Sequence, residues 1–225
     1  MFWDTTILLL IPAMIFAMYA QAKVQSTYGK YSHVKNNYGY KAYEVARKLL
    51  DGAGLYNVRI ERIPGNLTDH YDPRSRVLRL SETVYDSESI AAIGVAAHET
   101  GHAIQHAEGY IPLSVRNSLV PVANLGSTLA WPLVIFGFII GLTNLINIGI
   151  ILFSAAVIFQ VITLPVEFNA SNRAIHLLQT NGLFTREEIV PAQQVLRAAA
   201  LTYVAAALVS IMQLIRLLIL RDRSE

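Results

Sequence analysis

The stretch Asn117–Val166 reads NSLVPVANLGSTLAWPLVIFGFIIGLTNLINIGIILFSAAVIFQVITLPV and contains no Asp, Glu, Lys, Arg or His. A helix needs about 20 apolar residues to cross the ~30 Å hydrocarbon core of a bilayer, so this run is long enough to cross twice. Small and polar residues between Gly141 and Asn147 interrupt the run and suit a tight turn. The stretch therefore predicts a helical hairpin within a membrane.

Two further apolar stretches lie near the ends of the chain. The first lies between Asp4 and Lys23, and we interpret it as a retained anchor and not as a cleaved signal peptide, because its N-terminal flank holds an acid and no base. The last runs from about Ala198 to Leu220, and its Arg216 is close enough to the end to snorkel to the lipid headgroups. We thus expect a mainly α integral membrane protein with about four transmembrane helices.

The composition agrees with this class of protein. Of the 225 residues, 53% are hydrophobic and only 15% are charged, whereas a soluble domain of this size is usually more polar. The net charge of +2 and the lack of basic runs with interleaved aromatic residues argue against nucleic acid as a partner. The chain has no cysteine, so a bound metal must be held by histidine and carboxylate side chains.

The one sizeable polar region lies between the first anchor and the hairpin, and it is large enough for a small α+β domain. Within it, Tyr40–Leu50 has the apolar spacing of a scaffold helix. The segments Val58–Ile63 and Val77–Leu80 alternate apolar and charged residues, which indicates two short strands.

The same region contains the motif HETGH, His98–His102, within the helical stretch Ala91–Gln105. Asp86 and Ser87 precede this stretch as expected helix caps. Residues four apart share one face of a helix, so both imidazoles can bind one zinc ion at about 2.0–2.1 Å. Glu99 lies beside them, where it suits a general base acting on metal-activated water. The alternative is a chance HExxH on a surface helix, but the small apolar residues before it favour a buried helix.

His106 continues the same spacing, but we do not expect it to be the third ligand. Eight residues of helix rise about 12 Å, so His98 and His106 cannot both bind one ion. The pattern HExxHxxGxxH is absent, because Gln105 and Glu108 occupy its last two fixed positions. A supporting role for His106 beside a ligand stays open.

The third ligand must then be a carboxylate, and few are available. No aspartate occurs between Asp86 and Asp222, which argues against an intramembrane protease of the site-2 type. The glutamates that follow the motif are Glu108, Glu167, Glu187, Glu188 and Glu225. Glu108 points away from the motif, the last is the chain end, and Thr185–Glu188 looks like a capping box. We therefore predict Glu167, where an unpaired carboxylate at the end of an apolar stretch would be costly; a simple helix-end anchor is the alternative.

The chain resembles the YugP-like membrane zinc metallopeptidases, which have the gluzincin arrangement, and is more distantly similar to the HtpX-type and CAAX-processing membrane peptidases. The residues that carry this resemblance are HETGH, the ExxxS that begins at Glu167, and the segments LTDHYDPRSRVLRLS (67–81), AAHETGHAIQHAEGY (96–110) and PVEFNASNRA (165–174). Four residues after the metal-binding glutamate, the distant relatives usually have aspartate. Here the residue is Ser171, which can offer only a neutral hydrogen bond to a ligand histidine.

The resemblance also implies a zincin-like domain in which Leu67–Arg74 is the edge strand over the cleft and pairs with the substrate backbone. It implies a zinc-dependent membrane endopeptidase with one zinc ion per chain, acting on membrane-associated protein substrates. Glu99 would be the base. Further side chains could stabilise the oxyanion or support the ligands, and the sequence does not rank them: His70, Ser171, Arg173, His176 and Tyr203.

Two other functions are considered as alternatives. In a non-catalytic membrane scaffold, a structural zinc would tie the motif helix to a membrane span, but such a site has no need of Glu99 beside the histidines. A channel or transporter usually requires ionisable groups within its spans, and the apolar stretches contain almost none.

These expectations divide the chain into five parts. They are an N-terminal anchor (1–22), a membrane-proximal metallopeptidase domain (23–116), a transmembrane hairpin (117–166), a third-ligand helix and connector (167–197), and a C-terminal transmembrane helix with its tail (198–225). Basic residues near the span ends are more numerous on the side of the motif. The positive-inside rule therefore favours an active site that faces the cytoplasm, close to the surface of a bacterial plasma membrane.

Overall fold

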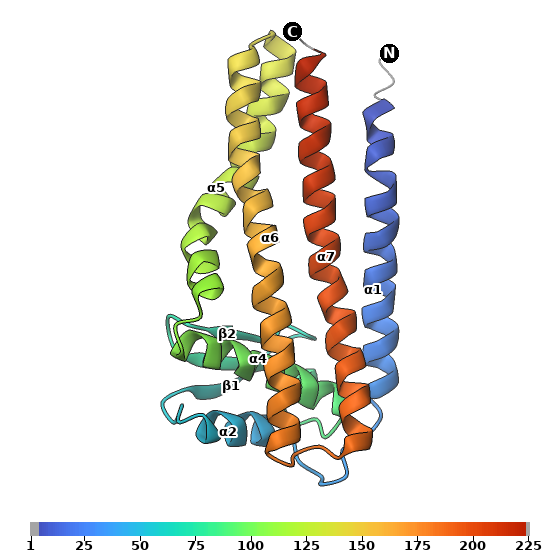
Figure 1. Cartoon of the computed structure of the whole chain (residues 1–225), viewed down its shortest axis with the longest axis vertical. Helices are drawn as coiled ribbons and strands as arrows, with labels where there is room; N and C mark the ends of the chain where they lie inside the picture. The colour runs from blue at the N-terminus through green and yellow to red at the C-terminus, as the bar shows by residue number, and fades with distance from the viewer. Residues whose placement is uncertain (1–4, 224–225) are drawn as a thin grey trace. The chain divides into compact units, whose positions relative to one another are not determined.

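The computed structural model describes residues 5–223, so Asp4 and Glu225, which were named above, lie outside the described residues. The described chain is mainly helical (Figure 1). Its elements are η1 (Thr5–Leu9), α1 (Ile11–Tyr31), α2 (Ala42–Gly52), β1 (Arg59–Ile63), β2 (His70–Asp72), β3 (Val77–Ser81), α3 (Glu82–Tyr85), α4 (Ile90–Ala107), α5 (Ile111–Ile140), α6 (Thr143–Thr180) and α7 (Arg186–Asp222).

Four helical segments are long and apolar enough to cross a membrane: Thr5–Tyr31, α5, α6 and α7. Together with the small sheet, they confirm a mainly α membrane protein with a small α+β part. The described chain divides into two compact units, of which unit 1 contains residues 5–21, 114–165 and 201–223. Unit 2 contains residues 22–113 and 166–200.

Unit 1 contains the hairpin formed by α5 and α6. Its turn is shorter than the predicted Gly141–Asn147, because only Gly141 and Leu142 lie between the two helices. Gly141 has a φ of 70°, in the left-handed region that glycine adopts without steric cost. A Cβ atom on Gly126 or Gly149 would collide with a carbonyl oxygen of the facing helix. Glycine at these positions therefore allows the two helices to pack closely, as small residues do in membrane helix pairs.

Unit 2 contains a three-stranded sheet of order β1-β3-β2. β1 pairs with β3 in parallel, and β2 pairs with β3 in antiparallel fashion, with Tyr71 opposite Leu78. The strands predicted at Val58–Ile63 and Val77–Leu80 are confirmed as β1 and β3. β2 is too short to show an alternating pattern, and only the resemblance pointed to it. It lies at the edge of the sheet, within the segment Leu67–Arg74 that the resemblance implied as an edge strand.

The helix α4 carries the HETGH motif and packs against α2, β2 and β3. Its N-cap is Ser89, whose Oγ accepts a hydrogen bond from the backbone N–H of Ala92 at 3.1 Å. The prediction of Asp86 and Ser87 as caps of this helix is wrong. Asp86 is the C-cap of the short helix α3, and the Ser87 hydroxyl donates to Oγ of Ser89. The N-cap therefore lies two residues after Ser87, and α4 itself begins at Ile90, one residue before the predicted Ala91.

The hydrophobic core of unit 2 combines α2, the sheet, α4 and the parts of α6 and α7 that belong to this unit. The predicted apolar face of Tyr40–Leu50 is confirmed by the buried residues of α2, which are Ala42, Val45, Ala46, Leu49 and Leu50. Full burial of a leucine side chain contributes about 1.5–3 kcal/mol, so this helix holds the motif helix firmly from one side.

The helices α4 and α6 cross at the glycine of the motif. A Cβ atom on Gly101 would lie 2.7 Å from the carbonyl oxygen of Ala170 and 3.2 Å from its Cα atom. Both residues are buried, so the two backbones are in direct contact. This crossing brings the segment of α6 just before Ala170 next to the HETGH motif.

We expect Gly101→Ala to lower the thermal stability of the detergent-solubilised protein. The added methyl group would collide with backbone atoms, and overpacking of this kind costs about 1–3 kcal/mol. Gly94→Ala is the matched control, because Gly94 is also buried in α4 but a Cβ atom there would have no neighbour within 4 Å. Thermal unfolding followed by circular dichroism compares the two variants. Equal midpoints would contradict the close crossing.

Candidate metal centre

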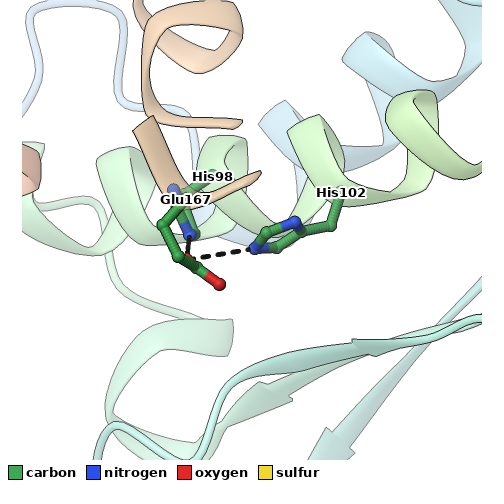
Figure 2. A group of neighbouring side chains, drawn as sticks. All are labelled: His98, His102 and Glu167. Carbon is green, nitrogen blue, oxygen red and sulfur yellow. Dashed lines mark hydrogen bonds and ion pairs between the residues drawn. The ribbon is translucent and has the colours of Figure 1, made fainter. Parts of the chain in front are cut away.

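Three side chains of unit 2 meet where α4 crosses α6 (Figure 2). His98 and His102 come from α4, and Glu167 comes from α6. One nitrogen of each histidine and one carboxylate oxygen all lie within 4.8 Å of one another. Oε2 of Glu167 is 3.2 Å from Nε2 of His98 and 3.4 Å from Nε2 of His102. The structure thus brings the three predicted ligands together, while their role as zinc ligands stays a prediction.

The group is well shielded from solvent. The side chain of Glu167 is 3% exposed and each imidazole is 12% exposed. Burial disfavours the charged form of His102, but its hydrogen bond to Glu167 and the negative charges of Glu99 and Glu167 outweigh this effect. The pKa of His102 is therefore raised. The surroundings of His102 thus favour positive charge, as a site for a divalent cation must.

A hydrogen bond behind His102 determines which of its nitrogens faces Glu167. Nδ1 of His102 lies 3.0 Å from Oε1 of Gln105. The amide of Gln105 has one consistent orientation, because its Nε2 donates to the carbonyl of Val166 and to Oδ1 of Asn169, both at 2.9 Å. Oε1 must then accept a hydrogen bond from the Nδ1–H of His102. The lone pair of the imidazole is consequently on Nε2, on the side of Glu167, where it can bind a metal.

His98 has a corresponding partner in Ser171, which lies four residues after Glu167 on α6. Oγ of Ser171 is 3.1 Å from Nδ1 of His98, so the hydroxyl oxygen can accept a hydrogen bond from the N–H of that nitrogen, which leaves the lone pair on Nε2. This is the neutral hydrogen bond that the sequence allowed for Ser171. Two neutral imidazole nitrogens and one carboxylate form a donor set that fits zinc.

A chain of contacts continues from this donor set across both helices. Oδ1 of Asn169 also accepts a hydrogen bond from Nε of Arg173 at 2.7 Å. Arg173 in turn forms an ion pair with Glu108, the C-cap residue of α4, at 2.7 Å. Gln105 and Asn169 were not predicted as supporting residues. The available signal was the position of Gln105, a polar residue three positions after His102 on a helix predicted to be buried.

Glu99 is 9% exposed and contacts the edge of the sheet. Its Oε2 accepts a hydrogen bond from the backbone N–H of Tyr71 at 2.9 Å. Since Tyr71 belongs to β2, and β3 pairs with only one side of that strand, the free edge of β2 faces Glu99. This contact of Tyr71 was not predicted, because a single backbone donor leaves no signal in the sequence.

The other predicted side chains lie outside the group of three ligands. His70 is exposed, with Nδ1 2.9 Å from the carbonyl of Thr68 and Nε2 3.4 Å from Arg79. His176 is exposed on α6, and Tyr203 belongs to the part of α7 in unit 1. The roles proposed for these three residues stay predictions.

The remaining polar residues near the motif have other partners. His106 contacts Tyr71 and not the three ligands, with 2.9 Å between Nδ1 and the phenol oxygen. Glu188 is 4% exposed, and its Oε2 accepts hydrogen bonds from the backbone N–H and the hydroxyl of Thr185 at 2.7 and 2.9 Å. Of the capping box predicted at Thr185–Glu188, the bond from the backbone N–H of Thr185 to the Glu188 carboxylate is present, which gives Glu188 a structural role at the start of α7.

Comparison with known proteins points to one class. Residues 6–222 match the model of the family described as "Putative neutral zinc metallopeptidase". The chain is 51% identical over 221 residues to "Putative membrane protease YugP" of Bacillus subtilis (strain 168), and the match covers 97% of this chain and 98% of that protein. No solved structure matches the chain.

We expect the purified protein to carry about one zinc ion per chain, because two histidines, one carboxylate and a water complete a four-coordinate site. Glu167→Ala should remove most of the zinc. Glu187→Ala is the matched control, since Glu187 is exposed, whereas Glu188 caps a helix and would disturb the fold. Elemental analysis by mass spectrometry measures the zinc content of each variant. Zinc that remains in Glu167→Ala but is lost in Glu187→Ala would show that the wrong glutamate was chosen.

Proposed function

The chain belongs to the family described as "Putative neutral zinc metallopeptidase", and on this basis we propose that it is a zinc-dependent membrane endopeptidase. The proposed ligands are His98, His102 and Glu167, in the gluzincin arrangement of HExxH and a glutamate from a second helix. The observation that carries the proposal is the meeting of these three side chains, with both Nε2 atoms directed at the carboxylate.

Glu99 is the proposed general base. When bound, zinc would polarise the peptide carbonyl and would also make water acidic enough to lose a proton near neutral pH, which turns that water into a nucleophile. Glu99 takes the proton of the attacking water and passes it to the leaving amine. One of its carboxylate oxygens is held by the Tyr71 N–H, and among the described residues the other has no hydrogen-bond partner. This second oxygen is free to exchange protons with the reactants.

A catalytic role is favoured over a purely structural zinc site. Structural zinc usually has four protein ligands, whereas catalytic zinc has three and keeps one position open. Within residues 5–223, the group at the crossing of α4 and α6 offers three ligands. Glu99 adds a carboxylate beside the group that a structural site would not need.

The free edge of β2 is the proposed binding surface for the substrate backbone. An extended peptide can pair with an exposed strand edge through main-chain hydrogen bonds, which do not depend on side chains. The Tyr71 N–H already points from this edge toward Glu99. A peptide bound here would therefore lie beside the proposed base.

The proposed site faces the cytoplasm close to the membrane surface. On its side of the membrane, the basic residues near the span ends are Lys23, Lys30, Lys35, Arg116, Arg173, Arg186 and Arg197. The opposite side has Arg216, Arg221 and Arg223. The positive-inside rule then favours the cytoplasm, and the position of Glu167 directly after the uncharged run places the site near the surface. Membrane proteins, or segments beside the membrane, are the proposed substrates.

Glu99→Gln should keep its zinc but lose at least about 100-fold in the hydrolysis of an unfolded protein substrate. The amide preserves the shape of the side chain but cannot act as a base, and general bases contribute about 10²–10⁴-fold. Glu187→Gln, at an exposed position, is the control. Release of fluorescent peptides from labelled casein measures the rate. Undiminished turnover by zinc-loaded Glu99→Gln would exclude Glu99 as the base.

The orientation can be tested because the natural chain has no cysteine. Single cysteines at Ser75, in the turn after β2, and at Ser224 would be exposed to a membrane-impermeant thiol reagent on intact cells. We expect labelling at position 224 and none at position 75, with labelling of both after permeabilisation. The opposite pattern on intact cells would place the proposed site outside the cytoplasm.

A further inference from the structure

Unit 2 has a cavity of about 260 Å³ near the C-terminal end of α4. Its polar lining consists of Asn57, Tyr71, Arg76 and His106, and apolar side chains complete it. A water molecule occupies about 30 Å³ in the liquid, so the cavity has room for a substrate side chain or chain end. None of the three proposed metal ligands lines it.

Tyr71 connects this cavity with the proposed catalytic site. Its backbone N–H donates to Glu99, and its side chain lines the cavity, with the phenol oxygen 2.9 Å from Nδ1 of His106. His106 lies one turn after His102 on α4, a rise of about 6 Å. The cavity is therefore a direct neighbour of the site along the motif helix.

A peptide that pairs with the free edge of β2 would extend from the site toward this cavity. Arg76, in the turn that follows β2, lines the cavity at the end of the strand. Residues in an extended chain advance about 3.3 Å each, so the cavity is within reach of substrate residues a few positions from the reacting bond. The cavity is placed to select among substrates.

Arg76 gives the cavity a positive charge. Among the described residues its guanidinium group has no hydrogen bond or ion pair. The neighbouring acid, Asp72, is already engaged by the hydroxyl of Ser75 at 2.6 Å, the backbone N–H of Arg74 at 2.9 Å and the guanidinium of Arg79 at 3.3 Å. The charge of Arg76 is thus available to a ligand, since a guanidinium group pairs well with a carboxylate.

Two further features indicate a binding site. When Nδ1 of His106 accepts a hydrogen bond from the Tyr71 hydroxyl, the neutral imidazole carries its proton on Nε2, and this N–H becomes a second donor. Arg76 has a φ of 52°, in the left-handed region that non-glycine residues seldom adopt. Backbone strain of this kind persists where the surroundings require it, and it concentrates at ligand sites.

We infer that this cavity is a subsite that binds a carboxylate of the substrate through Arg76 and His106. The carboxylate is either an acidic side chain or the C-terminal carboxylate of the peptide. The inference rests on the proposed peptidase function, because it treats the cavity as part of the same substrate cleft.

The test measures peptide binding to the full-length, zinc-loaded Glu99→Gln protein in detergent, using fluorescence polarisation. The probes are labelled nonapeptides of Ala and Gln, with a single Glu moved through each position, in amidated and free-acid forms. We expect about tenfold tighter binding of the peptide that has Glu at one particular position, or of the peptides in free-acid form. Charge-assisted hydrogen bonds of about 1.5–3 kcal/mol are sufficient for this difference at a partly exposed site. The two arms identify which carboxylate is bound.

In the Glu99→Gln background, Arg76→Asn should reduce the preference for the carboxylate-bearing peptide to twofold or less. This ratio corresponds to a difference of roughly 0.4 kcal/mol in binding free energy. Asparagine tolerates the left-handed conformation, so the turn is preserved. Arg74→Asn is the matched control, because Arg74 is exposed in the same turn but does not line the cavity. His106→Gln is a second variant that should weaken the preference independently of the turn.

Equal binding of all peptides, or a preference that survives in both Arg76→Asn and His106→Gln, would overturn the inference. The outcome is separable from that of the proposed function. Hydrolysis that depends on Glu99 but shows no carboxylate preference would exclude only the proposed carboxylate subsite. Conversely, a carboxylate preference that depends on Arg76, without any hydrolysis by the natural protein, would exclude only the proposed peptidase function.

Discussion

The burial of the Glu167 carboxylate is the constraint on which the rest of unit 2 depends. This side chain is 3% exposed, and its partners among residues 5–223 are the two imidazoles of the motif. A shielded carboxylate costs several kcal/mol unless it is paired, so α4 and α6 must be held at a fixed distance and register. The contact between Gly101 and Ala170 determines the distance, and the buried amide of Gln105 determines the rotation of the adjoining imidazole.

One helix serves several purposes along its length. The first turns of α4 are small and apolar and lie in the core, which anchors the helix against α2 and the sheet. The middle turns present His98 and His102 to α6, and the last turn presents His106 to Tyr71. Tyr71 contacts α4 twice, through its backbone to Glu99 and through its hydroxyl to His106, so the edge strand is fixed to the helix beneath it.

Local patterns were sufficient to predict the apolar helices, α2, α4, β1 and β3, and to single out the three side chains that meet at the crossing of α4 and α6. The uncharged run, the strand alternation and the HETGH spacing each depend on a period within one element, and the scarcity of carboxylates pointed to Glu167. The supporting contacts could not be predicted in this way, because Gln105 reaches Val166 and Asn169 across the chain. The N-cap of α4 was predicted wrongly, since Ser87 and Ser89 are equally good caps in sequence, and only the structure shows that Ser89 caps the helix.

The position of Glu167 in the chain has a consequence for biogenesis. The two histidines and the glutamate are separated by α5 and by the part of α6 that precedes Glu167. A nascent chain therefore lacks the complete donor set until the ribosome has synthesised the hairpin and the segment that follows it. A polypeptide still at the translocation machinery holds its histidines without their carboxylate partner, so its maturation is tied to the completion of the membrane segments and not to the folding of the polar region alone.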